Sequence, residues 1–265
     1  MCVAEHTLSP NSIYNMDCLE GMKLIDDTSV DMILCDLPYG TTACTWDSVI
    51  PFEPLWDQYR RVIKRNGAIV LTASQPFTTA LIASNMTWFK YCWVWVKSRS
   101  TDFVNAKNKP MRRHEDVCVF SEGTTANRSL RRMPYFPQGV IYKPSHQYRP
   151  NPKMKNGGVV GERPSHTRGY EREWENYPTS VITIKNPNNN SLHPTQKPVD
   201  LFVYLVQTYT NPGELVLDNC MGSGTTAVAC INTGRNYIGF ENNTVYYDSS
   251  LKRIAKHSET LGQTT

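Results

Sequence analysis

Several features that define other protein classes are missing from this 265-residue sequence. Its eight cysteines form no C-x-x-C pair, which argues against a zinc site or a secreted disulfide framework, so we expect reduced thiols and no metal. No apolar run approaches the roughly 18 residues that span a bilayer, and the N-terminus lacks a basic segment followed by an apolar one. We therefore expect a cytoplasmic protein that makes no membrane contact.

Outside one segment, the chain has no net positive charge. The formal net charge is +4, but residues 124–190 carry eleven Lys or Arg against four acids, or +7. The remainder has 17 Lys or Arg against 20 acids, or −3. This asymmetry favours a polyanion as the partner of segment 124–190, although charge alone fits a solvated basic loop equally well.

On both sides of that segment, short apolar runs alternate with amphipathic stretches, a pattern typical of a parallel sheet covered by helices. The sequence predicts strands at 30–35, 68–73, 90–98, 115–123, 181–184, 214–218 and 236–241. It predicts helices at 51–67, from near Pro76, at 198–210, at 224–234 and from about 243 to 256. Segment 124–190 is instead irregular, rich in Pro, Gly, Asn and Arg, and its many aromatic residues argue against plain disorder.

The stretch LVLDNCMGSGTTAVA contains a strand, a glycine turn and a helix start. Residues 222–227 match G-x-G-x-x-A, which on its own is a weak indication of a dinucleotide-binding turn. No Lys follows the glycines, so a phosphate-binding P-loop is excluded. Asp218 ends the strand before the turn and either serves a ligand or braces the loop. Glu241 ends the next strand, where a carboxylate can accept hydrogen bonds from a ribose diol.

The stretch ILCDLPYGTT places Asp36, Leu37, Pro38 and Tyr39 directly after an apolar strand. These residues suit methylation of a nucleobase amine, whose nitrogen is a poor nucleophile because its lone pair is delocalised into the ring. The Asp36 carboxylate and the Leu37 carbonyl can each accept one N–H of such an amine. Pro38 fixes the chain direction, and Tyr39 can stack on a base that has left the duplex.

Together these motifs resemble the S-adenosylmethionine-dependent amino-group DNA methyltransferases, which carry a D-P-P-Y tetrapeptide. The resemblance extends to the glycine loop LDNCMGSGTT, to HPTQKPVDLF (193–202) and to the approach MDCLEGMKLIDDTSVDMILCDLPYG. The catalytic tetrapeptide precedes the basic segment and the glycine loop follows it, an order similar to the circularly permuted β group. The implied fold is a seven-stranded, mostly parallel, Rossmann-like methyltransferase sheet. Residues 1–123 and 191–265 would then form the catalytic and cofactor-binding domain, and 124–190 a target recognition insert.

The resemblance implies roles for individual residues. The implied catalytic residues are Asp36, Leu37, Pro38 and Tyr39. Those implied for S-adenosylmethionine are Asp17, Asp36, His193, Thr195, Lys197, Asp218, Met221, Gly222, Ser223, Gly224, Thr225 and Glu241. For His193 a helix cap is the alternative, and for Lys197 a position in solvent. The expected DNA-binding residues are Arg128, Arg131, Arg132, Lys143, Arg149, Lys153, Lys155 and Arg168. We expect Trp46, Trp93 and Trp95 in the core or in a groove wall.

The function predicted is site-specific methylation of adenine N6 in double-stranded DNA by base flipping, as in restriction-modification. Methylation of cytosine N4 is the nearest alternative; in the family Ser tends to replace the acid for cytosine, so Asp36 favours adenine. An NAD-linked oxidoreductase is a second alternative. A non-catalytic DNA-binding protein is a third, because Leu37 replaces the first Pro of D-P-P-Y and Asn219-Cys220 replace a common Pro-Phe. A homodimer and a cognate restriction nuclease are the further candidate partners.

Overall fold

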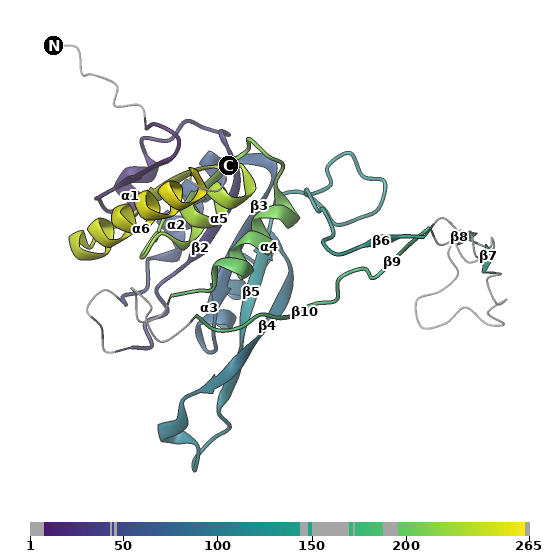
Figure 1. The fold of residues 1–265 in the computed structure, drawn as a ribbon, viewed down its shortest axis with the longest axis horizontal. Coiled ribbons are helices and arrows are strands. Elements are labelled where there is room, and N and C mark those ends of the chain that lie inside the picture. Colours follow the sequence, from purple (N-terminus) through teal and green to yellow (C-terminus); the bar gives the residue numbers. More distant parts are fainter. Residues whose placement is uncertain are drawn as a thin grey trace. The chain divides into compact units, whose positions relative to one another are not determined.

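The computed structural model describes residues 8–42, 44, 47–143, 148–149, 170–171, 173–187 and 196–262. Eight strands within these residues form the central sheet (Figure 1). In spatial order they are β1 (Ser12–Tyr14), β12 (Asn236–Phe240), β11 (Leu215–Asp218), β2 (Val30–Asp36), β3 (Ile63–Ala73), β5 (Arg112–Phe120), β4 (Phe89–Thr101) and β10 (Val181–Thr183). Strand β5 runs antiparallel to β3 and β4, and the other neighbouring pairs are parallel. The mostly parallel sheet expected from the sequence is thus confirmed.

The sheet has one strand more than the seven expected. Seven of its strands overlap the predicted ones, and the additional strand is β1 at the edge, where Ile13 lies opposite Gly239 of β12. Strand β1 contains three residues, with only Ile13 buried. Such a short element carries too few residues to show an alternating pattern, which explains why the sequence does not reveal it.

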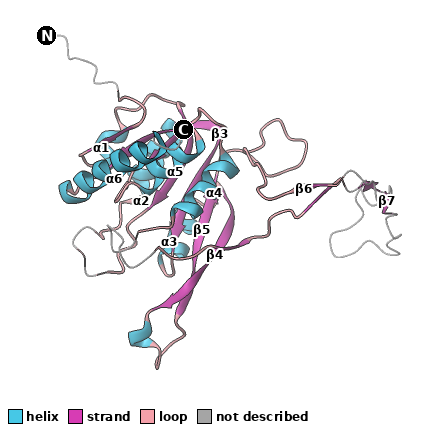
Figure 2. Cartoon of the chain, in the orientation of Figure 1, coloured by secondary structure: helices cyan, strands magenta, loops and turns pink. Residues whose placement is uncertain are grey.

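Helices cover both faces of the sheet (Figure 2). One face packs against α1 (Cys18–Met22), α2 (Phe52–Val62) and α3 (Phe77–Ser84). The other packs against α4 (Val199–Tyr209), α5 (Thr225–Thr233) and α6 (Thr244–Gly262). In the described ranges, no helix combines the length and the apolar character that crossing a bilayer would require.

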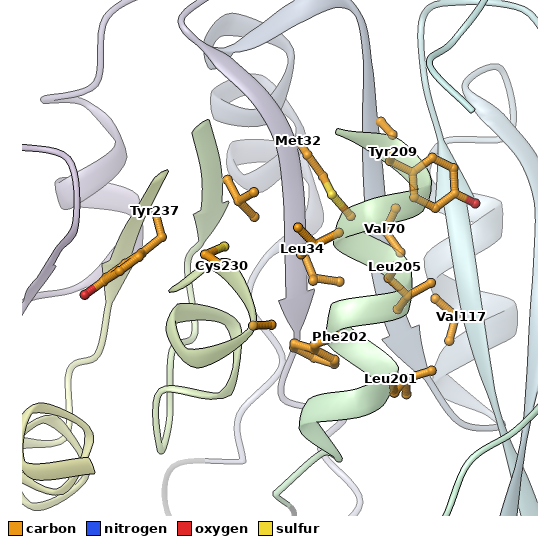
Figure 3. Close-up of a cluster of buried hydrophobic side chains, with 14 of the residues drawn as sticks. Met32, Leu34, Val70, Val117, Leu201, Phe202, Leu205, Tyr209, Cys230 and Tyr237 are labelled. Atoms are coloured by element: carbon orange, nitrogen blue, oxygen red, sulfur yellow. The ribbon is translucent and has the colours of Figure 1, made fainter. Parts of the chain in front are cut away.

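Alternate residues of β2 serve the two faces. Met32 and Leu34 are fully buried on the side of α4, in the cluster that Figure 3 draws. Ile33 and Cys35, equally buried, pack in the second cluster with residues of α2 such as Tyr59. Because helices cover both faces of the sheet, the sequence of a central strand is a continuous apolar run and does not alternate between apolar and polar residues.

The helix predicted for 51–67 ends five residues early. Helix α2 stops at Val62, and Ile63 is already extended and paired with Val30 as the first residue of β3. Gly67 is therefore not a helix terminator. A Cβ at this position would lie 2.7 Å from the carbonyl oxygen of Asp31, so the close approach of β3 to β2 beside an irregular register requires glycine.

The chain forms two compact units, one made of residues 1–136 and 180–265 and the other of residues 137–179. The first contains the whole sheet. In the second, β6 (Ile141–Tyr142) pairs with β9 (Trp174–Glu175), and β7 (Tyr148–Arg149) pairs with β8 (Tyr170–Glu171). The residues of the first unit that flank residues 137–179 are themselves hydrogen-bonded within the first unit. The Phe136 N–H donates to the Thr208 carbonyl at 2.8 Å, and the Val94 N–H donates to the Ser180 carbonyl at 2.8 Å.

Candidate active site

A cleft of about 970 Å³ opens where the parallel strands β2, β11 and β12 end. Open α/β sheets bind ligands outside the carboxyl ends of their strands, at positions of this kind. Its walls include the tetrapeptide from Asp36 to Tyr39, most of the glycine loop, and Glu241. The topology therefore brings the two principal sequence motifs, about 180 residues apart in the chain, to one cavity.

The Asp36 carboxylate lies at the end of β2 and is one-fifth exposed, at 22%. Its Oδ1 accepts hydrogen bonds from the Tyr39 hydroxyl at 2.9 Å and from the Thr72 hydroxyl. Thr72 sits directly opposite Asp36 in the β2–β3 register. The Lys197 ammonium donates to both carboxylate oxygens at 2.7 Å.

Lys197 belongs to a buried group of alternating charges. Its side chain is 6% exposed, which excludes the position in solvent considered from the sequence, and its Nζ also lies 3.4 Å from Glu115 Oε2. Burial opposes the charge of Lys197, but the carboxylates of Asp36 and Glu115 outweigh this and raise its pKa. Burial likewise opposes the charge of Glu115, yet Lys197 and Lys97 lower its pKa. Lys197 and Glu115 therefore stay charged, and Lys97 completes the group through its ion pair with Glu115.

Tyr39 packs rather than projecting freely into the cleft. Its ring stacks on that of Phe77, with centroids 5.2 Å apart and planes at 25°, and the Lys197 Nζ lies 5.4 Å from its centroid. Its hydroxyl also bonds to Thr72 at 3.0 Å. Burial, and then the charge of Asp36, raise the pKa of Tyr39 well above its ordinary value, so the hydroxyl stays protonated.

The chain after the tetrapeptide is held by Asp47. Its carboxylate accepts the N–H groups of Gly40, Thr41 and Thr42 at 2.8, 2.9 and 2.6 Å. Burial opposes ionisation, but the Thr42 hydroxyl and these three N–H groups together lower the pKa of Asp47. Gly40 has a φ of +66°, a conformation that favours glycine. Asp47 thus fixes the turn that follows Tyr39.

Glu241 braces the glycine loop from the neighbouring strand. Its Oε2 accepts the Gly222 N–H and its Oε1 the Asn243 N–H, each at 2.8 Å. Burial raises the pKa of Glu241, against the effect of these two N–H groups. Gly222 has a φ of +54°, and the nearest atom to a Cβ there would be 3.9 Å away. Glycine is therefore favoured here by the positive φ of the backbone, and the missing side chain leaves open space at the cleft wall.

Asp218, the last residue of β11, supports the same loop from the strand that precedes it. It accepts the Cys220 N–H at 3.0 Å and the Thr226 hydroxyl, and it is 2% exposed. Burial raises its pKa to about 6. The next residue, Asn219, accepts the Tyr59 hydroxyl at 2.6 Å. Asp218 thus makes the bracing contacts that the sequence offered as its alternative role, and it also lines the cleft.

At the far end of the loop, one guanidinium organises the start of α5. Arg253 of α6 donates to the Ser223 carbonyl at 2.9 Å and to the hydroxyls of Ser223 and Thr225 at 3.1 Å. Asp17 also lines the cleft, as the N-cap of α1, where its Oδ1 accepts the Leu19 and Glu20 N–H groups. Arg253 was not predicted from the sequence, since a lone Arg in an amphipathic helix carries no signal.

The cleft collects most of the predicted site residues. Those that line it are Asp17, Asp36, Leu37, Pro38, Tyr39, Lys197, Asp218, Met221, Gly222, Ser223, Thr225 and Glu241. Gly224 lies beside it as the N-cap of α5 and faces Ser250 of α6. His193 and Thr195 lie outside the described residues. Trp93 and Trp95 are buried, as expected, whereas Trp46 is outside the described residues.

The predicted DNA-binding residues divide between the two compact units. Arg128, Arg131 and Arg132 are exposed in the first, where Arg131 pairs with Glu122 at 2.8 Å. Lys143 of the second unit pairs with Glu175 at 2.7 Å. Only the backbone of Arg149 is described, and Lys153, Lys155 and Arg168 lie outside the described residues.

Comparison with known proteins decides the family. The N6_N4_Mtase family model, described as DNA methylase, matches residues 30–252, which include the tetrapeptide and the glycine loop. The chain belongs to this DNA methylase family. It is therefore a DNA methyltransferase of the N6/N4 type, and the oxidoreductase and non-catalytic alternatives are wrong.

Relatives of this methylase match most of its length. It is 27% identical over 262 residues to the Type II methyltransferase M1.MboII of Moraxella bovis, covering 92% of this chain and 96% of the relative. The structure of an M1.HpyAVI–SAM complex matches with a TM-score of 0.59 and 24% identity, covering 92% of this chain and 98% of that one. The PvuII DNA methyltransferase, described as cytosine-N4-specific, matches with a TM-score of 0.62 and 15% identity, covering 96% and 92%. The predicted methyltransferase fold is thus confirmed.

Proposed function

We propose that this methylase transfers a methyl group from S-adenosylmethionine to the N6 amino group of adenine in duplex DNA, at a specific sequence. One observation carries the proposal: the Asp36 carboxylate shares a cleft with the glycine loop that Glu241 braces. The similar structure of M1.HpyAVI is a complex with SAM, which supports the choice of cofactor. The Type II methyltransferase among the relatives supports a role in restriction-modification.

The residues at the glycine-loop end of the cleft fit such a cofactor. The space beside Gly222 admits close approach to the backbone, and the Glu241 oxygens each keep a lone pair beyond the N–H that they accept. Asp17, which follows the strand paired with β12, adds a second carboxylate to the cleft lining. Glu241 would hold the ribose diol, and Asp17 would lie near the adenine. When bound, S-adenosylmethionine supplies an electrophilic methyl group.

Asp36 and Leu37 prepare the target amine. Oδ1 of Asp36 already accepts from Tyr39, Thr72 and Lys197, whereas Oδ2 accepts from Lys197. Oδ2 is therefore the oxygen with room for one N–H of the amine, and the Leu37 carbonyl takes the other. When both N–H bonds are held out of the ring plane, the nitrogen lone pair is no longer delocalised into the ring. The fixed orientation of the amine also supplies much of the rate enhancement of methyl transfer.

Lys197 holds the Asp36 carboxylate from the protein side, through contacts to both of its oxygens. Its raised pKa means that it retains its own proton, so it acts as a counter-charge and not as a base. As the amine nitrogen gains positive charge during transfer, the Asp36 carboxylate stabilises it at hydrogen-bond distance. The surplus proton then leaves the nitrogen, and no covalent intermediate with the enzyme forms.

The target base must leave the duplex to reach this cleft, because its amine is otherwise paired. Tyr39 offers the extruded base an aromatic ring beside Asp36. Segment 124–190 would recognise the flanking sequence, and its exposed arginines Arg128, Arg131 and Arg132 would contact phosphates.

Product analysis tests the proposal. The protein is incubated with labelled S-adenosylmethionine and duplex DNA, and the DNA is then digested to nucleosides and analysed by mass spectrometry. N6-methyladenine in the wild type and its absence with Asp36→Ala are expected. N4-methylcytosine would contradict the choice of adenine while preserving the amine chemistry. Cofactor binding without transfer to any DNA would contradict the proposed reaction.

A further inference from the structure

The hairpin formed by β4 and β5 extends beyond the rest of the sheet (Figure 2). Its last paired residues are Thr101 and Arg112, and residues 102–111 form the tip, which includes the 3-10 turn η1 (Phe103–Asn105). The hairpin belongs entirely to the first compact unit, as does the cleft. The fold of this unit therefore fixes the position of the hairpin relative to the active site.

The hairpin is strongly basic. Residues 98–113 contain five Lys or Arg against the single acid Asp102, or +4, within a first unit whose other parts are not basic overall. Lys107 and Arg113 are exposed, and neither has an ion-pair partner in the part of the chain that the structure describes. These two cations, Lys107 in the tip and Arg113 at the adjoining start of β5, attract a polyanion.

Asp102 gives the tip a defined structure. It adopts a left-handed conformation with φ +72°, and its carboxylate pairs with Lys109 at 2.7 Å and with Arg112 at 3.7 Å. The Asn105 amide donates to the other carboxylate oxygen at 2.6 Å. One acid thus gathers two cations and closes the turn, so the basic tip is organised rather than a loose run of charged residues.

Two apolar side chains stand at the same tip. Phe103 is 79% exposed and Val104 is 93% exposed, although neighbouring strand residues such as Trp95 are buried. Adjacent apolar side chains that face water amid cations suit a partner with negative charge and stackable apolar surfaces. Duplex DNA has both, and DNA-binding proteins insert apolar wedges of this kind between base steps.

The paired strands of the hairpin line the cleft up to the start of the tip. Thr101 and Arg112 line the cavity that contains Asp36, together with Lys97 and Glu115 on the same two strands. A duplex that delivers a base to Asp36 must therefore run past the hairpin. The tip is then within reach of base pairs that flank the extruded one.

We infer that the tip of the β4–β5 hairpin is a duplex-binding wedge, distinct from segment 124–190. Lys107 and Arg113 contact phosphates, and Phe103 and Val104 press against the base steps beside the target and stabilise the distorted duplex. This inference rests on the proposed function, because it assumes a base extruded from duplex DNA.

Two double variants separate the apolar and the ionic contributions. Phe103→Ala/Val104→Ala should weaken duplex binding roughly tenfold and leave its salt dependence unchanged. The same variant should bind a single-stranded oligonucleotide as wild type does, since no stack remains to be opened. Lys107→Gln/Arg113→Gln should make the slope of log K against log salt shallower by about 1.8.

Matched controls come from surfaces outside the hairpin tip. Met86→Ala removes an exposed apolar side chain before the opposite end of β4, and Lys252→Gln/Lys256→Gln removes two exposed charges of α6. Neither should change duplex affinity. Thermal unfolding and cofactor binding verify that every variant is folded.

Duplex binding is measured separately from methyl transfer, so the two proposals fail differently. A wild type that binds DNA but transfers no methyl group contradicts the proposed reaction. Tip variants that bind duplex as tightly as wild type, in an active enzyme, overturn the wedge alone. A tip variant that instead changes the sedimenting mass of the protein assigns Phe103 and Val104 to a contact between two copies of the chain, which also overturns it.

Discussion

The Lys197 ammonium lies 2.7 Å from both carboxylate oxygens of Asp36, inside a wall of the active-site cleft. Two segments that are 161 residues apart in the sequence thus form one buried ion pair. The pair continues to Glu115 and from there to Lys97. Because each charge is matched by its neighbours, removal of any single member leaves an uncompensated buried charge.

Lys197→Met is expected to lower the free energy of unfolding by about 3–5 kcal/mol, since it leaves Asp36 without a cation and Glu115 with Lys97 alone. Urea denaturation measures this loss. The matched control is Lys23→Met, which breaks the exposed Lys23–Glu20 pair and should cost less than about 1 kcal/mol. Equal losses in the two variants would contradict the structural importance of the buried pair.

Asp36→Ala is expected to abolish methyl transfer while cofactor affinity stays within roughly tenfold, or about 1.4 kcal/mol. Under the proposed function the carboxylate acts on the target amine, whereas the glycine loop holds the cofactor. Calorimetric titration measures cofactor affinity, and nucleoside analysis measures methyl transfer. Asp36→Asn removes the charge at nearly the same side-chain volume, so it checks that the loss of transfer does not come from the cavity left by Asp36→Ala. Asp57→Ala, on an exposed turn of α2, is the control and should behave as wild type. Normal methylation by Asp36→Ala would refute the role of this acid.

Glu241→Ala is expected to weaken cofactor binding at least about tenfold, because the Gly222 N–H loses its acceptor and the ribose loses a carboxylate. At saturating cofactor the rate constant should recover much of its wild-type value. Glu214→Ala is the matched control, since Glu214 accepts the Asn211 N–H at 2.7 Å before β11, away from the cleft. If both variants bind the cofactor alike, Glu241 has no special role.

Asp218 should make stability depend on pH. Its pKa is raised from 3.8 to about 6, so the folded state binds more protons than the unfolded state between these values. Stability is then highest below pH 4 as far as this group is concerned, and it falls as the pH rises to about 6. Relative to Asp218→Asn, the wild type should lose up to about 3 kcal/mol across this window. Parallel profiles for the two proteins would show that Asp218 ionises normally.

Arg131→Gln/Arg132→Gln should make the salt dependence of DNA binding shallower, by about 1.8 in the slope of log K against log salt if both contact phosphates. Fluorescence anisotropy at several salt concentrations measures the slope. The Lys252→Gln/Lys256→Gln variant serves again as the control for a general change in charge. An unaltered slope in the arginine variant would argue that these side chains do not reach the backbone of DNA.

The sequence predicts the motif-bearing parts of the site because they follow strand ends. Asp36 and Asp218 both end apolar runs, and parallel strands bring such ends to one edge. Thr72 could have been found as a polar residue that closes an apolar strand, but its pairing with Asp36 depends on the β2–β3 register. Lys97 and Glu115 have no local signal, since only the fold buries them together.

Sequence patterns report only local preferences, and this also explains the errors in the predicted fold. The predicted helix 51–67 continues past Val62 because residues 63–66 have no helix-breaking side chain, and strand pairing with Val30 overrides their preference. Asp47 was missed for a related reason. Its three backbone contacts depend on the turn at Gly40, which the spacing of residues does not specify.

The two anchored ends of residues 137–179 have a consequence for how such an enzyme diversifies. Phe136 and Ser180 bond to α4 and β4, elements that stay in place whatever lies between them. Under the proposed role of this region in recognition, natural exchange of the intervening cassette would yield methylases with new target sites and unchanged chemistry. Under that role, selection would act on specificity without disturbing the ionic cluster that contains Asp36.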